Sequence, residues 1–340
     1  MATAEHAQPI TDRSVVGPRD PATETPPRAD GSIRRTSTID MLRPDGWTGD
    51  LVLRGRARDL VTTASEAHAV AEARVDVRAD VTRALIAIDT TPALPRADEL
   101  LGAPVGGGFR GRVDAVAPDE RARATPLYLL LDDLPVAALV SGYAMQRTNQ
   151  IGRMPVEAYS YNTDQCAGWR AGGTLMLVLS DKGSVPMTIG PAAPELARID
   201  DPLAWHEHDP LPTHGMRRRR RVDVRRDEED GALHVDAMFR DSYLGADGIE
   251  TIVHEYSCTA TVDPHTLTVV AAEARPRVLP YIECPEAAAS ARRLAGLTVT
   301  DLRARVRREF TGISTCTHLN DLLRSLADVG ALASALAATA

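Results

Sequence analysis

The feature that most constrains the fold is a run of strand-like segments followed by helix-like segments, which occurs twice along the chain. In each run, apolar and polar residues alternate in segments bounded by Gly, Pro, Asn or Asp, as is typical of β-strands. The strand-like segments are 33–41, 51–59, 69–77 and 84–89 in the first run, and 216–224, 231–241, 250–262 and 267–274 in the second. Helix-like residues follow, at about 100–139 and 285–336.

This order predicts an α+β fold with two related halves, each with about four antiparallel strands followed by helices. Short motifs recur at corresponding places, since Arg34-Arg35 resembles Arg217-Arg218 and Arg58-Asp59 resembles Arg240-Asp241. We expect a disordered tail over 1–31, a first half over 32–140, an irregular connecting segment over 141–215 and a second half over 216–336. The tail is polar and rich in proline, so it buries little apolar surface.

The composition narrows the classes of partner. The 340 residues carry a formal net charge of −8, which argues against nucleic-acid binding because phosphate affinity requires an excess of cations. The five consecutive arginines from Arg217 are therefore interpreted as part of a strand. We expect a cytoplasmic protein without a membrane span or signal peptide, because no apolar run approaches about 18–20 residues. The four cysteines form no CxxC pair, so reduced thiols are expected.

The strongest candidate for chemistry lies near the C-terminus, where Cys316, His318 and Asp321 precede an apolar helical run. With Thr317 as the helix N-cap, the helix dipole would lower the pKa of the Cys316 thiol. Asp321 lies three residues after His318 and would orient its ring. The pattern favours a nucleophilic Cys–His–Asp arrangement, with His318 as general acid or base. Alternatively, Cys316 is a small buried apolar residue and His318 a capping or buried structural imidazole.

Further candidates come from the second half. The strand 250–262 places His254 on the same side as Tyr256 and Cys258, so His254 joins the catalytic candidates; otherwise it is a structural histidine. The expected substrate-binding residues are Arg240, Asp241, Tyr256, Tyr281 and Cys284. No cofactor is predicted. A zinc site formed by Cys284, Cys316 and His318 with Cys166 or His254 is an alternative by ligand type.

Other motifs favour structural roles. Asp132-Asp133 is expected on an exposed helix face, and His206, His208 and His214 in a solvated linker. The segments 166–169 and 175–179 suggest one ordered hairpin-like patch. The first half has Pro126 and Tyr128 where the second has Cys316 and His318, so the scaffold does not require a thiol and an imidazole there.

Several residues of the second half carry a family resemblance. They are Arg217-Arg218, Phe239-Arg240-Asp241, Val253 to Tyr256, Pro280-Tyr281 with Cys284-Pro285, Leu294 to Gly296, and Cys316-Thr-His-Leu319. Over roughly 216–330 the chain resembles a bacterial family known only as domain of unknown function 2889. The first half looks like the longer actinobacterial members. The resemblance implies that these segments form a unit and implies no reaction.

Two hypotheses from different classes follow. The first is a small-molecule enzyme that uses acid/base or thiol chemistry in a pocket of the C-terminal half, for acyl transfer, hydrolysis or lyase/isomerase reactions. The second is a non-catalytic binding or assembly protein with a pseudo-symmetric scaffold. The expected partner is a small-molecule ligand, without nucleic acid or membrane, and the oligomeric state is left open.

Overall fold

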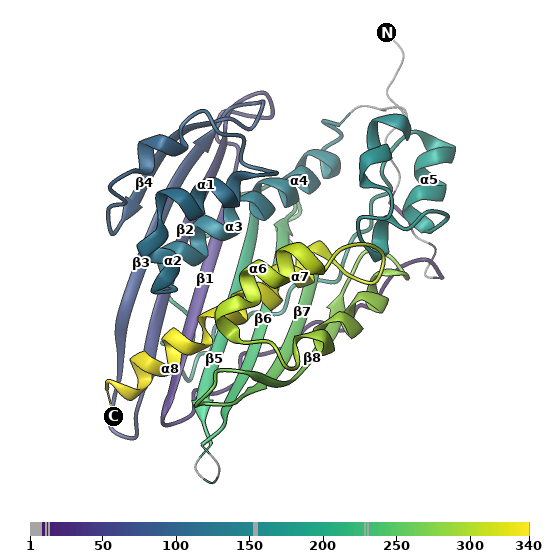
Figure 1. Ribbon diagram of the computed structural model, residues 1–340. Helices are drawn as coiled ribbons and strands as arrows, with labels where there is room; N and C mark the ends of the chain where they lie inside the picture. Colours follow the sequence, from purple (N-terminus) through teal and green to yellow (C-terminus); the bar gives the residue numbers. More distant parts are fainter. Residues whose placement is uncertain are drawn as a thin grey trace.

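The strand-like segments of both halves join one antiparallel sheet (Figure 1). The computed structural model describes residues 9–10, 12, 14–151, 156–227, 229 and 231–339. The strand order is β4-β3-β2-β1-β5-β6-β7-β8, so each half contributes four consecutive strands. The strands are β1 (Ser32–Leu42), β2 (Leu51–Thr62), β3 (Ala67–Ala79), β4 (Leu85–Thr91), β5 (Met216–Arg226), β6 (Leu233–Leu244), β7 (Glu250–Val262) and β8 (Val269–Val278). The α+β prediction is confirmed, and helices follow the strands in each half.

The two halves meet at the pair formed by β1 and β5. In this antiparallel pair Arg34 lies opposite Asp223, and Asp40 lies opposite Arg217. Both pairs form ion pairs, with 2.6 Å from Arg34 Nε to Asp223 Oδ1 and 2.5 Å from Arg217 Nε to Asp40 Oδ1. An arginine of β1 therefore binds an aspartate of β5, and an arginine of β5 binds an aspartate of β1.

A second set of matched ion pairs joins the first two strands of each half. Arg35 of β1 binds Asp59 of β2, with 2.6 Å from Nη2 to Oδ2. Arg218 of β5 binds Asp241 of β6, with 2.7 Å from Nε to Oδ1. Neighbouring residues on a strand point to opposite faces, so these pairs face the other side of the sheet from Arg34 and Arg217.

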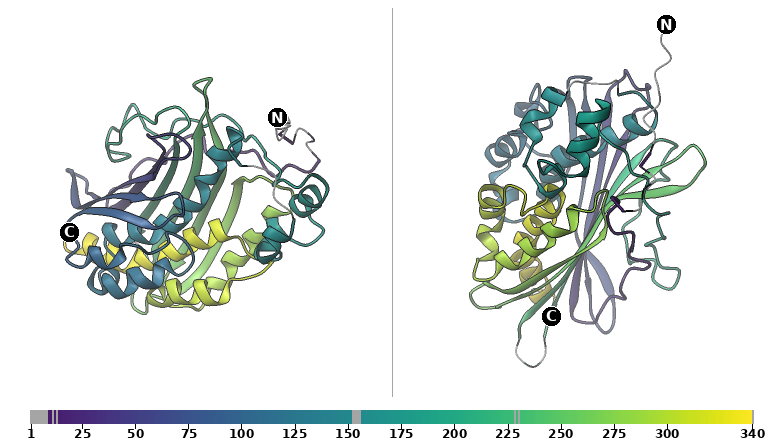
Figure 2. Two further views of the ribbon diagram at one scale, coloured as in Figure 1. Left: turned by 90° about the horizontal axis from the view of Figure 1, so that it is seen from above. Right: turned by 90° about the vertical axis from the view of Figure 1, so that its right-hand side faces the viewer.

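Helices of both halves cover one face of the sheet, as the right-hand view of Figure 2 shows. In the first half these are η1 (Ala97–Leu100), α1 (Phe109–Val116), α2 (Pro118–Ala122), α3 (Pro126–Val140) and α4 (Gly142–Arg147). In the second half they are η4 (Cys284–Leu294), η5 (Val299–Asp301), α6 (Leu302–Glu309), α7 (Thr317–Ser325), η6 (Leu326–Asp328) and α8 (Val329–Ala337). Their apolar side chains form the core with the sheet; Leu130 and Leu134 of α3 and Leu319 and Leu322 of α7 are fully buried.

One helical stretch, Pro126–Arg147, is long and apolar enough to cross a membrane by length and composition. Of its most apolar window, 83% is buried inside the protein. That degree of burial is typical of a core helix, because a helix on the sheet must be apolar on the sides that it buries.

A layer of paired charges lies between the helices and the sheet. It combines the arginines Arg35, Arg110, Arg218, Arg220, Arg303 and Arg324 with the aspartates Asp59, Asp132, Asp133, Asp241, Asp321 and Asp328. Asp132 and Asp133 were expected on an exposed face, and that expectation is wrong because both are buried against arginines. Buried carboxylates require such partners, since an unpaired buried charge is costly.

The N-terminal chain from residue 14 to 31, part of the expected tail, lies along the sheet. Its position depends on polar contacts more than on apolar burial. Arg28 forms an ion pair with Asp201 at 2.8 Å, and Thr25 Oγ1 donates to the carbonyl of Leu196 at 2.6 Å. Residues 1–8, 11 and 13 of the expected tail lie outside the described residues.

The connecting segment runs from the helices to the opposite face of the sheet. It includes η2 (Val156–Asn162), η3 (Ala167–Trp169) and α5 (Thr174–Lys182), so the expected hairpin-like patch is a helix instead. His206 was expected in a solvated linker, yet it is buried. Its Nδ1 lies 2.8 Å from Thr36 Oγ1 and its Nε2 lies 3.0 Å from Thr38 Oγ1. The segment therefore supplies part of the buried structure over β1.

Candidate active site

Two histidines from distant parts of the second half stack on each other. His254 lies on β7 and His318 on the first turn of α7, and their ring centroids are 3.9 Å apart at an interplanar angle of 20°. Side chains alternate along β7, and His254 is on the side that faces the helices. Both residues are half-buried, and the His254 side chain is 15% exposed. Their proximity brings two of the predicted catalytic residues together.

Asp241 lies on the other side of His254. The two residues are opposite each other on β6 and β7, and His254 Nδ1 is 3.5 Å from Asp241 Oδ2. Arg218 donates to both oxygens of Asp241, at 2.7 and 2.8 Å. Burial opposes ionisation of Asp241, but Arg218 and His254 hold its pKa below the usual range. The site thus contains a fixed carboxylate, which the sequence suggested only as a substrate-binding residue.

Cys316 lies on the other side of His318. It is the N-cap of α7, one residue before the expected N-cap Thr317. Its Sγ is 3.9 Å from His318 Nδ1. Residues two apart on a regular helix point away from each other, and the two side chains meet here because Cys316 has extended backbone angles outside the helix.

The expected lowering of the Cys316 pKa is not found. Burial raises the pKa of the thiol to about 12, and the neighbouring Cys166 acts in the same direction. Backbone N–H groups of Leu319 and His318 and a contact with Tyr256 oppose this increase only in part. Burial also lowers the pKa of His318 well below its ordinary value, with a contribution from His254. At neutral pH the site therefore contains a protonated thiol beside a neutral imidazole.

Asp321 does not orient His318 as predicted. Its partners are Arg110, at 2.7 Å, Arg324, at 3.4 Å, and Arg218, at 3.6 Å. Three arginines therefore surround this carboxylate on the side of α7 that faces α1 and α3. The nearest equivalent of an orienting acid is Asp241, which contacts His254.

The remaining predicted residues fall into two groups. Tyr256, Tyr281 and Cys284 are buried together with Cys316 and Cys166. The hydroxyl groups of Tyr256 and Tyr281 donate to backbone carbonyls of Cys284 and Pro186, at 3.2 and 2.7 Å. These side chains pack around the Cys316 thiol, and the two tyrosine hydroxyl groups already have hydrogen-bond acceptors.

Arg240 belongs to the second group, which does not lie at this site. It is fully buried on the opposite face of the sheet, where it binds Glu255 and donates to the carbonyls of Ala22 and Pro194, both at 2.6 Å. The alternation of side chains along β6 explains this placement, because Arg240 and Asp241 are neighbours and point in opposite directions. Arg218 occupies the position beside Asp241 instead, as one of five consecutive arginines that the sequence does not distinguish.

A metal ion at this site would need ligand atoms that converge on one point. Among the described residues, Asp241, His254 and His318 have ligand atoms that all lie within 4.8 Å of one another. A zinc ion must lie in the plane of each ring about 2.0–2.1 Å from the nitrogen. The planes of the two stacked rings differ by only 20°, so they meet much farther from the nitrogen atoms than a metal–ligand bond length. In addition, Arg218 already donates to both oxygens of Asp241. The rings as placed do not fit a common metal ion, and among the described residues no group of three ligand atoms that includes a cysteine lies within 4.8 Å of one another.

Comparison with known proteins gives one match. Residues 216–331 match a family described as "Protein of unknown function (DUF2889)". The matched region contains Asp241, His254, Cys316 and His318. Searches of curated proteins and of solved structures give no match.

Proposed function

We propose that the chain is a small-molecule enzyme with Cys316 as nucleophile. Residues 216–331 match the model of the DUF2889 family, whose function is unknown, so the site itself has to indicate the chemistry. The observation that carries this proposal is the distance of 3.9 Å between Cys316 Sγ and His318 Nδ1. In the tautomer with a proton on Nε2, His318 Nδ1 accepts the thiol proton while Sγ attacks an acyl carbon of the substrate. Acyl transfer or hydrolysis is the reaction class that this arrangement favours.

The stacked histidine and the carboxylate control the charge of His318. Its protonated form is disfavoured by burial and by His254, while Asp241 favours it. A base with a low pKa does not trap the proton, so it returns the proton to the leaving group as the bond between that group and the acyl carbon breaks. Water or an acceptor nucleophile then takes the acyl group from the sulfur, which regains its proton. His254 and Asp241 are positioning residues in this proposal, since neither contacts the sulfur.

The second candidate is a non-catalytic binding or assembly protein. It is favoured by the burial of Cys316, which is only 6% exposed, and by its raised pKa. In that case Cys316 and His318 stabilise the start of α7. The enzyme and the non-catalytic protein therefore differ in whether the Cys316 thiol reacts in the folded protein.

The test is acylation of the native protein by a small activated ester, with the modified cysteine identified by mass spectrometry. Cys258 is a matched control, because it is also buried and its pKa is also raised to about 12, mainly by burial. We expect Cys316 to acylate about 10²-fold or more faster than Cys258 and to lose that advantage in His318→Gln. Equal rates for both thiols, or no effect of His318→Gln, would favour the non-catalytic candidate.

We also infer a cytoplasmic location and an internal repeat. The four cysteines are buried and free, which suits a reducing compartment. The matched ion pairs, Arg34–Asp223 with Arg217–Asp40, support a repeat. The proposed ligand is a small molecule, without nucleic acid or membrane, since the five consecutive arginines Arg217–Arg221 of β5 are buried and bind acidic side chains.

A further inference from the structure

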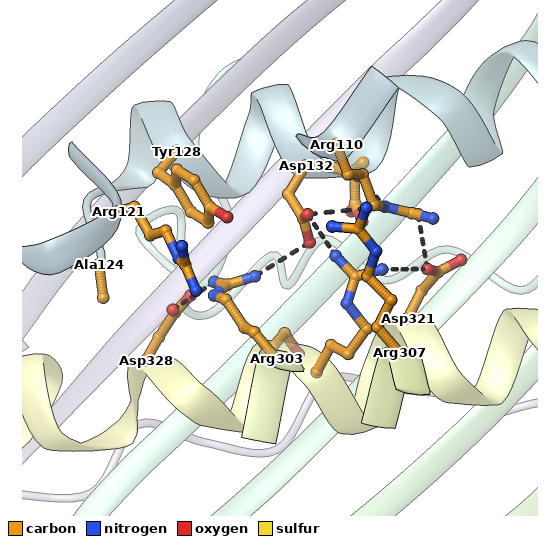
Figure 3. A network of polar contacts seen from close by, with 12 residues as sticks. Arg110, Arg121, Ala124, Tyr128, Asp132, Arg303, Arg307, Asp321 and Asp328 are labelled. Atoms are coloured by element: carbon orange, nitrogen blue, oxygen red, sulfur yellow. Dashed lines mark hydrogen bonds and ion pairs between the residues drawn. The ribbon is translucent and has the colours of Figure 1, made fainter. Parts of the chain in front are cut away.

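A pocket of about 370 Å³ lies between α3 and α6 and is rich in arginine. Its lining includes Arg121, Arg303, Arg307, Arg308 and Arg324, against the two acids Asp114 and Asp132. Figure 3 shows most of these side chains, which reach toward one another from the helices on either side. The lining therefore carries more positive than negative charge.

The two acids are shared by several cations each. Asp132 binds Arg303 at 3.0 Å, Arg324, and Arg110 at 3.5 Å. These arginines lower the pKa of Asp132 to about 2 despite its burial. Arg303 also binds Asp328, and Arg110 and Arg324 also bind Asp321. Each guanidinium group has five N–H donors, so these shared carboxylates leave some donors unused.

The second acid is shared in the same way. Asp114 lies 3.4 Å from Arg307 and 3.7 Å from Arg121, and it also accepts from the Tyr128 hydroxyl at 2.5 Å. Both of its arginine contacts are long, and the two arginines are about half exposed at the rim. Among the described residues, Arg121 and Arg307 thus keep donors available for a further anion.

Arg324 gives an independent indication. Its side chain is only 5% exposed, and its Nε is buried without a hydrogen-bond partner in the part of the chain that the structure describes. Arg324 lines this pocket and also a neighbouring one of about 460 Å³. A buried donor without a partner is costly, so the aspartates that bind Arg324 leave part of its hydrogen-bonding capacity unused.

We propose that this arginine pocket binds an oxyanion, a phosphate or carboxylate group, of a small-molecule ligand. The planar guanidinium groups match the paired oxygens of such anions. The neighbouring pocket shares Arg307 and Arg324 and extends to Thr317, which lies between Cys316 and His318. A ligand anchored by its anion therefore has a path toward the first turn of α7. The anion site does not depend on chemistry at Cys316.

The test is calorimetric titration of the full-length protein with inorganic phosphate and, separately, with succinate, at constant ionic strength set by chloride. We expect saturable binding of at least one anion, and the tighter one identifies the group recognised. Arg307→Gln is expected to weaken binding about tenfold, because it removes a charge-assisted hydrogen-bond donor. Arg121→Gln is a second variant from the opposite side of the pocket.

Arg305→Gln is the matched control. Arg305 is on the same helix with similar exposure, but it binds Glu309 at 2.6 Å and does not line the pocket. The anion affinity of the Arg305→Gln variant is expected to stay within twofold of that of the unchanged protein. Thermal unfolding without anion should show that all variants are folded. The absence of saturable binding by either anion overturns the proposal. Equal weakening by Arg305→Gln and Arg307→Gln also overturns it.

Discussion

Cys316 lies at the start of α7, where the N–H groups of His318 and Leu319 point toward its sulfur, yet burial determines the charge of the thiol. A helix dipole stabilises a nearby anion by about 0.3–1 kcal/mol at an exposed position. The loss of hydration of a buried thiolate outweighs that gain, and the pKa rises. Because Cys316 is a protonated thiol at neutral pH, it is reactive only if the neighbouring imidazole of His318 accepts its proton.

The ion pair between Asp133 and Arg220 allows a prediction about stability. Asp133 accepts from Arg220 Nη2 at 2.8 Å, and both side chains are buried. In Asp133→Ala the guanidinium loses its charged partner, so we expect a loss of about 3–5 kcal/mol in the free energy of unfolding. Urea unfolding measures this loss. Asp119→Ala, at an exposed position of α2, is the control and is expected to stay within about 0.5 kcal/mol.

The buried imidazole of His206 allows a prediction about how the free energy of unfolding depends on pH. Burial lowers its pKa to about 3 in the folded protein, from an ordinary value of 6.5. Below pH 6.5 the unfolded chain binds a proton at this position that the folded chain does not, so stability falls as the pH falls toward 3. The slope contributed by one such group is about 1.4 kcal/mol per pH unit. His206→Gln should remove this part of the slope in urea unfolding at several pH values, whereas His265→Gln, at an exposed position, should not.

At the scale of elements, the periodic segments identified the strands well. The expected segments 33–41 and 250–262 correspond to β1 (Ser32–Leu42) and β7 (Glu250–Val262), because alternation is a local property of the chain. The partners of individual charges depend on register and helix placement, which are not local. Asp321 and Asp132 illustrate this, since each binds arginines that are close only in the folded chain, and neither partnership was predicted.

The connecting segment gives a prediction at the same scale. Near Gly190 it lies directly against β7, and Ile252 N donates to the carbonyl of Pro191 at 3.0 Å. A Cβ atom at residue 190 would lie 1.7 Å from the carbonyl oxygen of Ile252, so Gly190→Ala requires the backbone to move. We expect a loss of about 1–3 kcal/mol or more in the free energy of unfolding. Gly106→Ala has no atom within 4 Å of the added Cβ and should leave stability nearly unchanged; equal losses would contradict the close contact.

At the scale of the whole molecule, the two halves share one sheet and one layer of charges. Since β1 pairs with β5 along their length, a fragment of residues 216–340 would expose the edge of β5 and leave Arg217 and Arg220 without Asp40 and Asp133. We expect this fragment alone to lack a cooperative unfolding transition, and co-expression with residues 1–215 to restore one. Circular dichroism during urea unfolding distinguishes the two cases. A cooperative transition of the isolated fragment would show that the family-matched region folds alone, and that the shared sheet stabilises a unit already formed.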